Sequence, residues 1–362
     1  MDRSAYALKK LGKIRVGLIG DGGRAVARHV AALGLLADYE LVSLHSSHSS
    51  SSIGPSELLS TSASAAEVAH HPQVDLVAIV GAAPCAYDAA CEAMLAGKDV
   101  YCDWPIGTIV ESADAISALA QRSGVCHFVG LQLRLFPVIR YMGDLIARGH
   151  CGKISSLRVT ASPPLAHTPS ATPGAGKLAV AAPDIAIHFL DAAFSVTGRP
   201  KFLSGLVGSG ADWERLQARL SEPAQFCMIG KLDNDAMFSV HLDTRAWHEA
   251  CLMLDISGDA GKLRLSASAG EFVNASLVGR RQSNGDPVRL AIPKTYHWFF
   301  RSAMTSDVIG VANLYAAFAH DLHEGTHLVP DLQDGLLMNR ILNLALRSSE
   351  LGHRIDLTQP SG

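Results

Sequence analysis

The sequence contains few charged residues and no long hydrophobic run. Of its 362 residues, 18% are charged and 48% are apolar, a composition typical of a packed globule rather than a disordered chain. No apolar run approaches the roughly 20 residues that a bilayer span requires. The start of the chain also lacks the apolar segment of a secretory signal, so we expect a cytoplasmic protein.

Basic patches and paired cysteines are missing too. The formal net charge is −3 and no block is rich in lysine and arginine, so neither nucleic acid nor a membrane surface is an expected partner. The seven cysteines are scattered without a C-x-x-C pair, which favours reduced thiols that act as small buried side chains.

The first third of the chain alternates short apolar runs with alanine-rich stretches. Because strands rich in Val, Ile and Leu with helices between them form βαβ units, we expect a parallel sheet. The expected strands are Ile14–Ile19, Leu41–Leu44, Leu76–Val80, Val100–Cys102 and His127–Val129, and the expected helices are Ala25–Leu36, Ala86–Ala96 and Val110–Arg122.

The pattern changes near Arg134, where a helix over Pro137–Arg148 precedes a series of alternating apolar stretches. We expect strands at Ile154–Ala161, Phe202–Val207, Gln225–Ile229, Ala236–Leu242, Cys251–Ser257 and Lys262–Leu265, and helices at Asp184–Val196, Asp307–His320 and Asp331–Leu351. The predicted fold class is α/β. Residues 1–133 are expected to form a Rossmann dinucleotide-binding domain, and residues 134–362 an α/β domain with a large, mostly antiparallel open sheet.

A glycine-rich turn directly follows the first expected strand. Gly20, Gly22 and Ala25 form a G-x-G-x-x-A pattern that opens a helix. The first glycine permits the tight turn, the second lets a pyrophosphate approach the backbone, and the small third residue lets helix and strand pack closely. The helix N-terminus supplies N–H donors, so the pattern predicts dinucleotide binding.

The acidic residue that holds the adenosine ribose in NAD-binding proteins is missing. The second strand instead ends in Leu44-His45-Ser46-Ser47. With no carboxylate to repel a 2′-phosphate, the sequence favours NADP, while NAD stays possible because no arginine stands there. The alternative interpretation of the serine run is a surface loop.

A histidine between two carboxylates marks the expected helix in the second half. Asp184, His188 and Asp191 are spaced by four and three residues, which places them near one helix face. Neighbouring carboxylates favour the charged imidazole and orient the ring, so His188 is a candidate acid/base or hydroxyl-binding group. A structural histidine beside an N-capping Asp is the alternative.

The segment from His323 to His327 spells H-E-x-x-H, the string of zinc proteases. That string needs both histidines on one continuous helix. Gly325 stands inside the motif and a Pro follows closely, so we expect a helix end here and no metal site.

Taken together, the glycine turn, "CDWP", "GLQLRLFP" and "DIAIHFLD" resemble the glucose–fructose oxidoreductase/inositol dehydrogenase (Gfo/Idh/MocA) family. The resemblance covers essentially the whole chain. It implies a Rossmann domain followed by an open-sheet domain often used for dimerisation, and hydride transfer between NAD(P) and sugars, inositols or related polyols.

One residue departs from the family pattern. Where most family enzymes carry Glu-Lys-Pro, this chain has Asp103-Trp104-Pro105. The lysine is the usual acid/base partner of the reacting hydroxyl, and an indole N–H does not exchange protons near neutral pH. The family's later aspartate and histidine fall on Asp184 and His188. Lys177 or Tyr101 are candidate replacements for the lysine.

The tryptophan at this position, "SLHSS" after the second strand and "GLQLRLFP" together resemble one branch of the family, which contains the fungal repressor of the galactose regulon. Three hypotheses therefore stay open. The chain is an NAD(P)-dependent oxidoreductase in which His188 is the acid/base group and Asp184 orients it, a non-catalytic nucleotide sensor in which Trp104 stacks on a ligand, or a lyase or isomerase that recycles the hydride.

The resemblance implies further binding residues. Those expected around the cofactor are Gly20, Gly22, Gly23, Arg24, Ala25, Ser46, Ser47, Ala83, Pro84, Asp103, Trp104, Pro105 and Gln132; those expected around the substrate are Trp104, Arg134, Lys177, Asp184 and His188. Arg134 has an ion pair at the domain interface as its alternative. The expected partners are a small sugar-like molecule and further copies of the chain, as a dimer or tetramer formed through the C-terminal sheet.

Overall fold

The structure is a computed structural model that describes residues 12–20, 23–46, 60–81, 86–104, 113–162, 182–208, 225–243, 251–268, 272–281, 285–299 and 304–358. The chain divides into two compact units. The first unit comprises Met1–Leu135 and Trp298–Leu337, and the second comprises Phe136–His297 and Met338–Gly362. The division expected at residue 133 assigned all later residues to the second domain and so did not include the return of Trp298–Leu337 to the first unit.

A six-stranded parallel sheet forms the centre of the first unit. Its order is β3-β2-β1-β4-β5-β6, the order of the doubly wound dinucleotide-binding fold. The strands are β1 (Ile14–Gly20), β2 (Tyr39–Ser46), β3 (Ser60–Thr61), β4 (Leu76–Val80), β5 (Asp99–Cys102) and β6 (His127–Val129). The predicted parallel α/β sheet is confirmed, and all five of the predicted strands are present.

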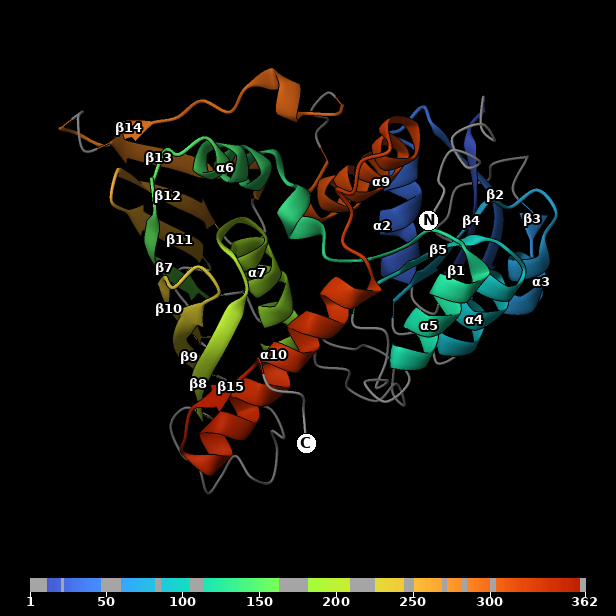
Figure 1. Cartoon of the computed structure of the whole chain (residues 1–362). Coiled ribbons are helices and arrows are strands. Elements are labelled where there is room, and N and C mark those ends of the chain that lie inside the picture. Colours follow the sequence, from blue (N-terminus) through green and yellow to red (C-terminus); the bar gives the residue numbers. More distant parts are fainter. Residues whose placement is uncertain are drawn as a thin grey trace. The chain divides into compact units, whose positions relative to one another are not determined.

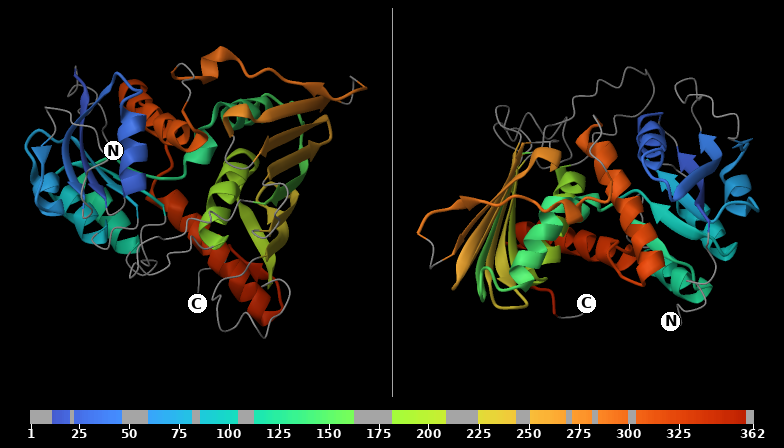
Figure 2. Two further views of the ribbon diagram at one scale, coloured as in Figure 1. Left: turned by 180° about the vertical axis from the view of Figure 1, so that it is seen from behind. Right: turned by 90° about the horizontal axis from the view of Figure 1, so that it is seen from above.

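Helices cover both faces of this sheet, as Figures 1 and 2 show. On one face α2 packs against β1 and β2 and against α9, and on the other α3 packs against β1 and α4 against β4 and β5. The helices are α2 (Gly23–Leu33), α3 (Ala65–His70), α4 (Ala86–Leu95), α5 (Ala113–Ser123) and α9 (Ser306–Glu324), with the short 3₁₀ turn η1 (Gln132–Leu135). Because both faces are covered, β4 and β5 are buried along their whole length.

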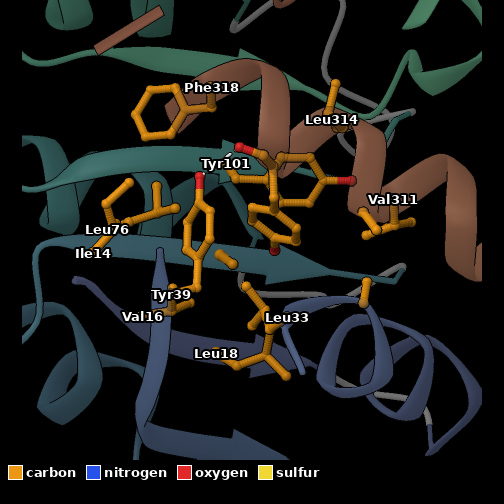
Figure 3. Packing of buried hydrophobic residues seen from close by; sticks show 14 of the residues in the cluster. Ile14, Val16, Leu18, Leu33, Tyr39, Leu76, Tyr101, Val311, Leu314 and Phe318 are labelled. Carbon is orange, nitrogen blue, oxygen red and sulfur yellow. Dashed lines mark hydrogen bonds between the residues drawn. The ribbon is translucent and has the colours of Figure 1, made fainter. Parts of the chain in front are cut away.

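The returning segment completes the core of the first unit. Val311, Leu314 and Phe318 from α9 pack with Leu33 of α2 and Tyr101 of β5 (Figure 3). Phe128 stacks on Phe318 with ring centroids 4.3 Å apart. Although α9 begins 177 residues after the end of β6 in sequence, it is therefore an integral layer of the Rossmann unit.

The second unit contains a nine-stranded sheet in the order β14-β13-β12-β11-β7-β10-β9-β8-β15. All its neighbouring strands are antiparallel except β7 and β10. The strands are β7 (Ile154–Ala161), β8 (Pro200–Gly208), β9 (Gln225–Leu232), β10 (Met237–Asp243), β11 (Cys251–Gly258), β12 (Gly261–Ser268), β13 (Ser276–Arg281), β14 (Val288–Arg289) and β15 (Ile355–Asp356). The predicted open, mostly antiparallel sheet is confirmed; β13, β14 and β15 had no clear sequence signal.

Three helices lie wholly or partly in the second unit. Figures 1 and 2 show α6 (Pro137–Ala147) and α7 (Ala182–Thr197) on one face, and α10 (Leu332–Leu351) begins in the first unit and ends in the second. Two further short turns are η2 (Phe272–Asn274) and η3 (Lys294–Tyr296). Along β9, β10 and β12 buried and more exposed residues alternate, as expected for a sheet covered on one face only.

None of the helices within the described ranges is long and apolar enough to cross a membrane.

Candidate nucleotide-binding site

The glycine turn lies where the strand order of the first sheet reverses. β1 pairs with β2 on one side and with β4 on the other, and the carboxyl ends at such a switch point form the crevice in which doubly wound folds bind ligands. A Cβ on Gly20 would stand 2.5 Å from Cγ2 of Val26 and 2.9 Å from Cγ2 of Val80. Only glycine therefore allows the strand end, α2 and β4 to approach this closely.

The first turn of α2 presents its backbone at the same edge. Gly23 and Arg24 are exposed and Ala25 is partly buried, and Gly23 is the first residue of the helix. N–H groups at a helix start favour an anionic group such as a pyrophosphate. Of the other expected cofactor residues, Gly22, Ser47, Ala83, Pro84 and Pro105 lie outside the described residues.

At the end of β2 the structure shows hydroxyls and an imidazole rather than a carboxylate. The hydroxyl oxygens of Ser43 and Ser62 are 2.8 Å apart, and Nδ1 of His45 lies 3.1 Å from the carbonyl oxygen of Ser62. Since a carbonyl only accepts, Nδ1 carries the proton in this contact. Ser46 ends the strand level with Gly20 and is partly exposed.

Asp103, directly after β5, is the centre of a partly buried hydrogen-bond network. Its Oδ2 accepts from the guanidinium of Arg28 at 3.1 Å and from the N–H of Gly81 at 2.9 Å. Its Oδ1 lies 3.3 Å from Nε2 of His29 and accepts from the hydroxyl of Tyr101. On the far side of His29, Nδ1 lies 2.9 Å from the hydroxyl of Tyr315 on α9.

The electrostatics of this network keep Asp103 ionised. Burial acts to raise the pKa of Asp103, but His29, Arg28 and the Tyr101 hydroxyl together hold it below its usual range. Burial lowers the pKa of His29 below its ordinary value despite the nearby carboxylate. At neutral pH the network therefore contains one carboxylate, one guanidinium and a neutral imidazole.

Trp104 is buried beside this network, with 9% of its surface exposed. A Cβ on Gly335, in the first turn of α10, would stand 2.5 Å from Cζ3 of the indole, so the benzo ring packs directly on that glycine. The pyrrole N–H lies on the opposite side of the ring. Within the described residues Nε1 is buried and has no hydrogen-bond partner.

The predicted substrate residue Arg134 forms an ion pair inside the first unit. Its guanidinium donates to Asp334 at 2.9 Å. At the start of α10 the backbone N–H of Asp331 donates to the Asp334 carboxylate, and the backbone N–H of Asp334 donates to the Asp331 carboxylate. The sequence left open an ion pair at the domain interface for Arg134; the structure shows an ion pair with Asp334, and both residues belong to the first unit. Gln132 lies in the same 3₁₀ turn, η1, and is partly exposed.

The predicted catalytic pair lies in the second unit. Asp184 is in the first turn of α7 and His188 follows one turn later; His188 is partly exposed. Asp191, expected on the same polar face, is buried at 1% exposure because α7 packs against α6 and against β7 and β11. Lys177 lies outside the described residues, and the roles expected for all these residues stay predictions.

The H-E-x-x-H string falls at the end of α9, as expected. The helix ends at Glu324, and Gly325 adopts a left-handed conformation with φ of 68°, so the two histidines do not share one helix. Nowhere in the part of the chain that the structure describes do three or more His, Cys, Asp or Glu side chains form a group that could hold a metal ion.

Sequence reasoning missed His29, Arg28, Tyr315 and Gly335. One signal was present: His29 stands in the buried stripe of α2 between Val26 and Leu33, and a buried imidazole requires a polar partner. That partner is 74 residues away in Asp103 and 286 residues away in Tyr315. No local spacing indicates either contact.

The first unit is thus a doubly wound, dinucleotide-binding type of domain. Residues 14–131 match the model of the GFO_IDH_MocA oxidoreductase family with its NAD-binding Rossmann fold. Over these residues the chain is similar to the NAD-binding Rossmann domain of that family.

One curated relative and many solved structures are similar to the chain. The dehydrogenase aclE of Aspergillus oryzae is 36% identical over 87 residues, which is 24% of this chain and 24% of that protein. The match therefore spans only about a quarter of the length of that relative.

The solved structures share the whole fold. A super-repressor mutant of Gal80p from Saccharomyces cerevisiae superposes with a TM-score of 0.78 at 19% identity, covering 96% of this chain and 99% of that one. An aldose–aldose oxidoreductase from Caulobacter crescentus gives 0.74 at 16% identity, covering 95% and 100%. Because a repressor and an enzyme match similarly well, the structural likeness does not single out the repressor branch that the sequence suggested.

Proposed function

We propose that the protein is an NAD(P)-dependent oxidoreductase that transfers hydride to or from a carbon bearing a hydroxyl or keto group in a sugar, inositol or related polyol. The observation that carries this proposal is the glycine turn at Gly20, placed at the switch point of a sheet that matches an NAD-binding family. The aldose–aldose oxidoreductase among the similar structures supports the substrate class.

In the mechanism that we propose, the chain itself moves one proton. A bound nicotinamide supplies the hydride acceptor or donor. His188 takes the proton from the substrate hydroxyl as the hydride leaves the same carbon, and returns it in the reverse direction. Asp184, one helical turn before His188, orients the imidazole or binds a second hydroxyl.

The proposed binding residues are those expected from the sequence around the cofactor and around the substrate. Gly20, Gly22, Gly23, Arg24 and Ala25 hold the pyrophosphate, and Ser46 and Ser47 lie near the adenosine ribose. NADP is the favoured cofactor because β2 ends without a carboxylate, and NAD is the alternative. We further propose a cytoplasmic homo-oligomer formed through the nine-stranded sheet.

The test begins with fluorescence titrations of the protein with NADPH and NADH. Sugars, inositols and their keto forms are then added while nicotinamide absorbance is followed. Turnover on one of these compounds is expected, and His188→Ala should lower kcat by about 10²- to 10⁴-fold. The matched control is His241→Ala, a histidine exposed on β10 of the same unit, which should leave kcat unchanged. Equal effects of the two variants would remove His188 from the proposal.

A second candidate function is a nucleotide sensor that binds without turnover, and Trp104 favours it. The indole replaces the lysine of the family enzymes and is packed against Gly335, where it has no capacity for proton exchange. Tight NADPH binding with no turnover on any compound of the panel would favour the sensor. Turnover that depends on His188 would exclude it.

A further inference from the structure

The carboxylate of Asp103 has no acceptor site left for a ligand. An ionised carboxylate offers about four lone-pair positions. Arg28 and Gly81 donate to Oδ2, and His29 and Tyr101 donate to Oδ1. All four positions are thus occupied by donors of the first unit, although the family resemblance places this residue among the cofactor ligands.

The same contacts determine which nitrogen of His29 carries the proton. Because ionised Asp103 only accepts hydrogen bonds, Nε2 of His29 must be the donor across 3.3 Å. In the neutral imidazole Nδ1 is then an acceptor, so the Tyr315 hydroxyl donates to it across 2.9 Å. The result is a directed chain from the Tyr315 hydroxyl through His29 to Asp103, joining α9, α2 and the end of β5.

The Tyr315–His29–Asp103 hydrogen-bond chain also determines the position of Trp104, the residue that follows Asp103. Gly130 packs so closely that a Cβ there would stand 2.9 Å from the Tyr101 hydroxyl and 3.0 Å from the backbone nitrogen of Trp104. With Asp103 hydrogen-bonded on every side and its neighbour confined by Gly130, the end of β5 has no room to shift alone. A displacement of Asp103 within this hydrogen-bonded chain would therefore also displace Trp104.

We infer that the Tyr315–His29–Asp103 chain is a positioning network that places Trp104 at the nucleotide site, and that Asp103 itself contacts no ligand. Tyr315 and His29 are positioning residues in this scheme. The expected effect of the network on cofactor affinity rests on the proposed function. The arrangement of its hydrogen bonds does not rest on that function and is tested by a separate measurement.

Two buried tyrosines provide a matched pair of variants. Tyr315→Phe removes the hydroxyl that donates to His29. Tyr39→Phe removes a hydroxyl that donates to the carbonyl oxygen of the same Tyr315 at 2.6 Å, and the two rings are in contact with centroids 5.3 Å apart. Both changes delete one buried hydrogen bond at α9, but only the first interrupts the chain to Asp103.

The first measurement uses nitrogen NMR of the histidine rings and tryptophan indoles without cofactor. We expect a protonated Nε2 and an unprotonated Nδ1 for His29 at neutral pH. Tyr315→Phe should shift the indole N–H signal of Trp104, and Tyr39→Phe should not. A protonated Nδ1 in the wild type, or equal indole shifts in both variants, would overturn the inference.

The second measurement is the Kd for NADPH and NADH by fluorescence. Tyr315→Phe should weaken binding about tenfold, the size of one buried hydrogen bond. Tyr39→Phe should lower the Tm about as much as Tyr315→Phe does, but leave Kd unchanged. Equal losses of affinity would show a merely structural role and overturn the inference. If the wild type binds neither nucleotide, the proposed function fails, and the NMR result alone decides whether the network positions Trp104.

Discussion

The two sheets of the molecule differ in whether helices cover both of their faces or only one. The parallel sheet of the first unit is covered on both sides, and its central strands β4 and β5 are buried throughout. The sheet of the second unit carries its helices on one face and leaves large apolar side chains exposed on strands β8, β9 and β10, namely Leu206, Ile229 and Met237. The first sheet is thus a closed core with the candidate site at one edge, whereas the second sheet has one face exposed.

The largest expected effect separates two isoleucines, one in each sheet. Ile79 in β4 is 1% exposed and Ile229 in β9 is 58% exposed. Ile79→Ala should lower the free energy of unfolding by about 2–5 kcal/mol because it leaves a cavity in a packed core. Ile229→Ala should change it by under about 0.5 kcal/mol. Urea denaturation of both variants measures the difference, and similar losses would contradict the comparison.

The covered face of the second sheet is tested by two glycines in β8. A Cβ on Gly205 would stand 2.1 Å from the carbonyl oxygen of Ala345 in α10, whereas a Cβ on Gly208 has its nearest neighbour at 3.8 Å. Gly205→Ala should destabilise by about 1–3 kcal/mol through overpacking. Gly208→Ala is the control and should be nearly neutral. Thermal unfolding of the two single variants ranks them.

The closed core of the first unit also predicts a pH dependence. The pKa values of His29 and Asp103 are both lowered in the folded protein, so the unfolded chain binds protons that the folded one excludes. Stability should be fully present above the unfolded pKa of His29, about 6.5, and fall below it at up to about 1.4 kcal/mol per pH unit for this group, with Asp103 adding below about pH 4.

The variant that tests this pH dependence is His29→Gln. It should flatten the loss of stability between pH 7 and pH 5 in denaturant titrations. His241→Gln, which changes an exposed histidine, should keep the wild-type slope. An unchanged slope in His29→Gln would mean that the folded protein accepts a proton at His29.

The smallest effect on folding, but a clear one on assembly, is expected on the open face. Ile229→Lys should leave the free energy of unfolding of the monomer nearly unchanged. If the exposed face mediates the proposed homo-oligomer, the variant should be monomeric in light scattering while the wild type is a dimer or tetramer. His241→Gln on the same face tests whether any change there has this effect, and identical masses for all three proteins would exclude this face.

The local patterns predicted the elements well where one face or both faces of a strand had to be apolar. Leu76–Val80 and Ile154–Ala161 were predicted with the bounds that the structure shows. β14 and β15, each two residues long, were missed because a pair of residues has no periodicity to detect. The parallel pairing of β7 with β10 was also hidden, since an alternating strand reads the same in either direction.

In the candidate site, too, local sequence patterns predicted some residues and missed contacts between distant ones. Gly20 was predicted as a turn glycine because its role depends on the neighbouring strand and helix in sequence. Trp104 was assigned to a ligand by resemblance, and its packing on Gly335 could not be foreseen. That contact joins residues more than 200 positions apart, and no sequence period extends that far.

By itself, therefore, the sequence determined the βαβ alternation, the glycine turn and the missing ribose-binding acid, because each depends on residues within about one helix or strand of one another. The missing lysine was identified only through the family resemblance. Only the tertiary structure decided that α9 returns to the Rossmann unit and that Asp103 is bound by His29, Arg28 and Gly81. Burial is the physical reason. An ionised carboxylate taken out of water needs partners at every lone pair, and the folded chain supplies them from distant segments.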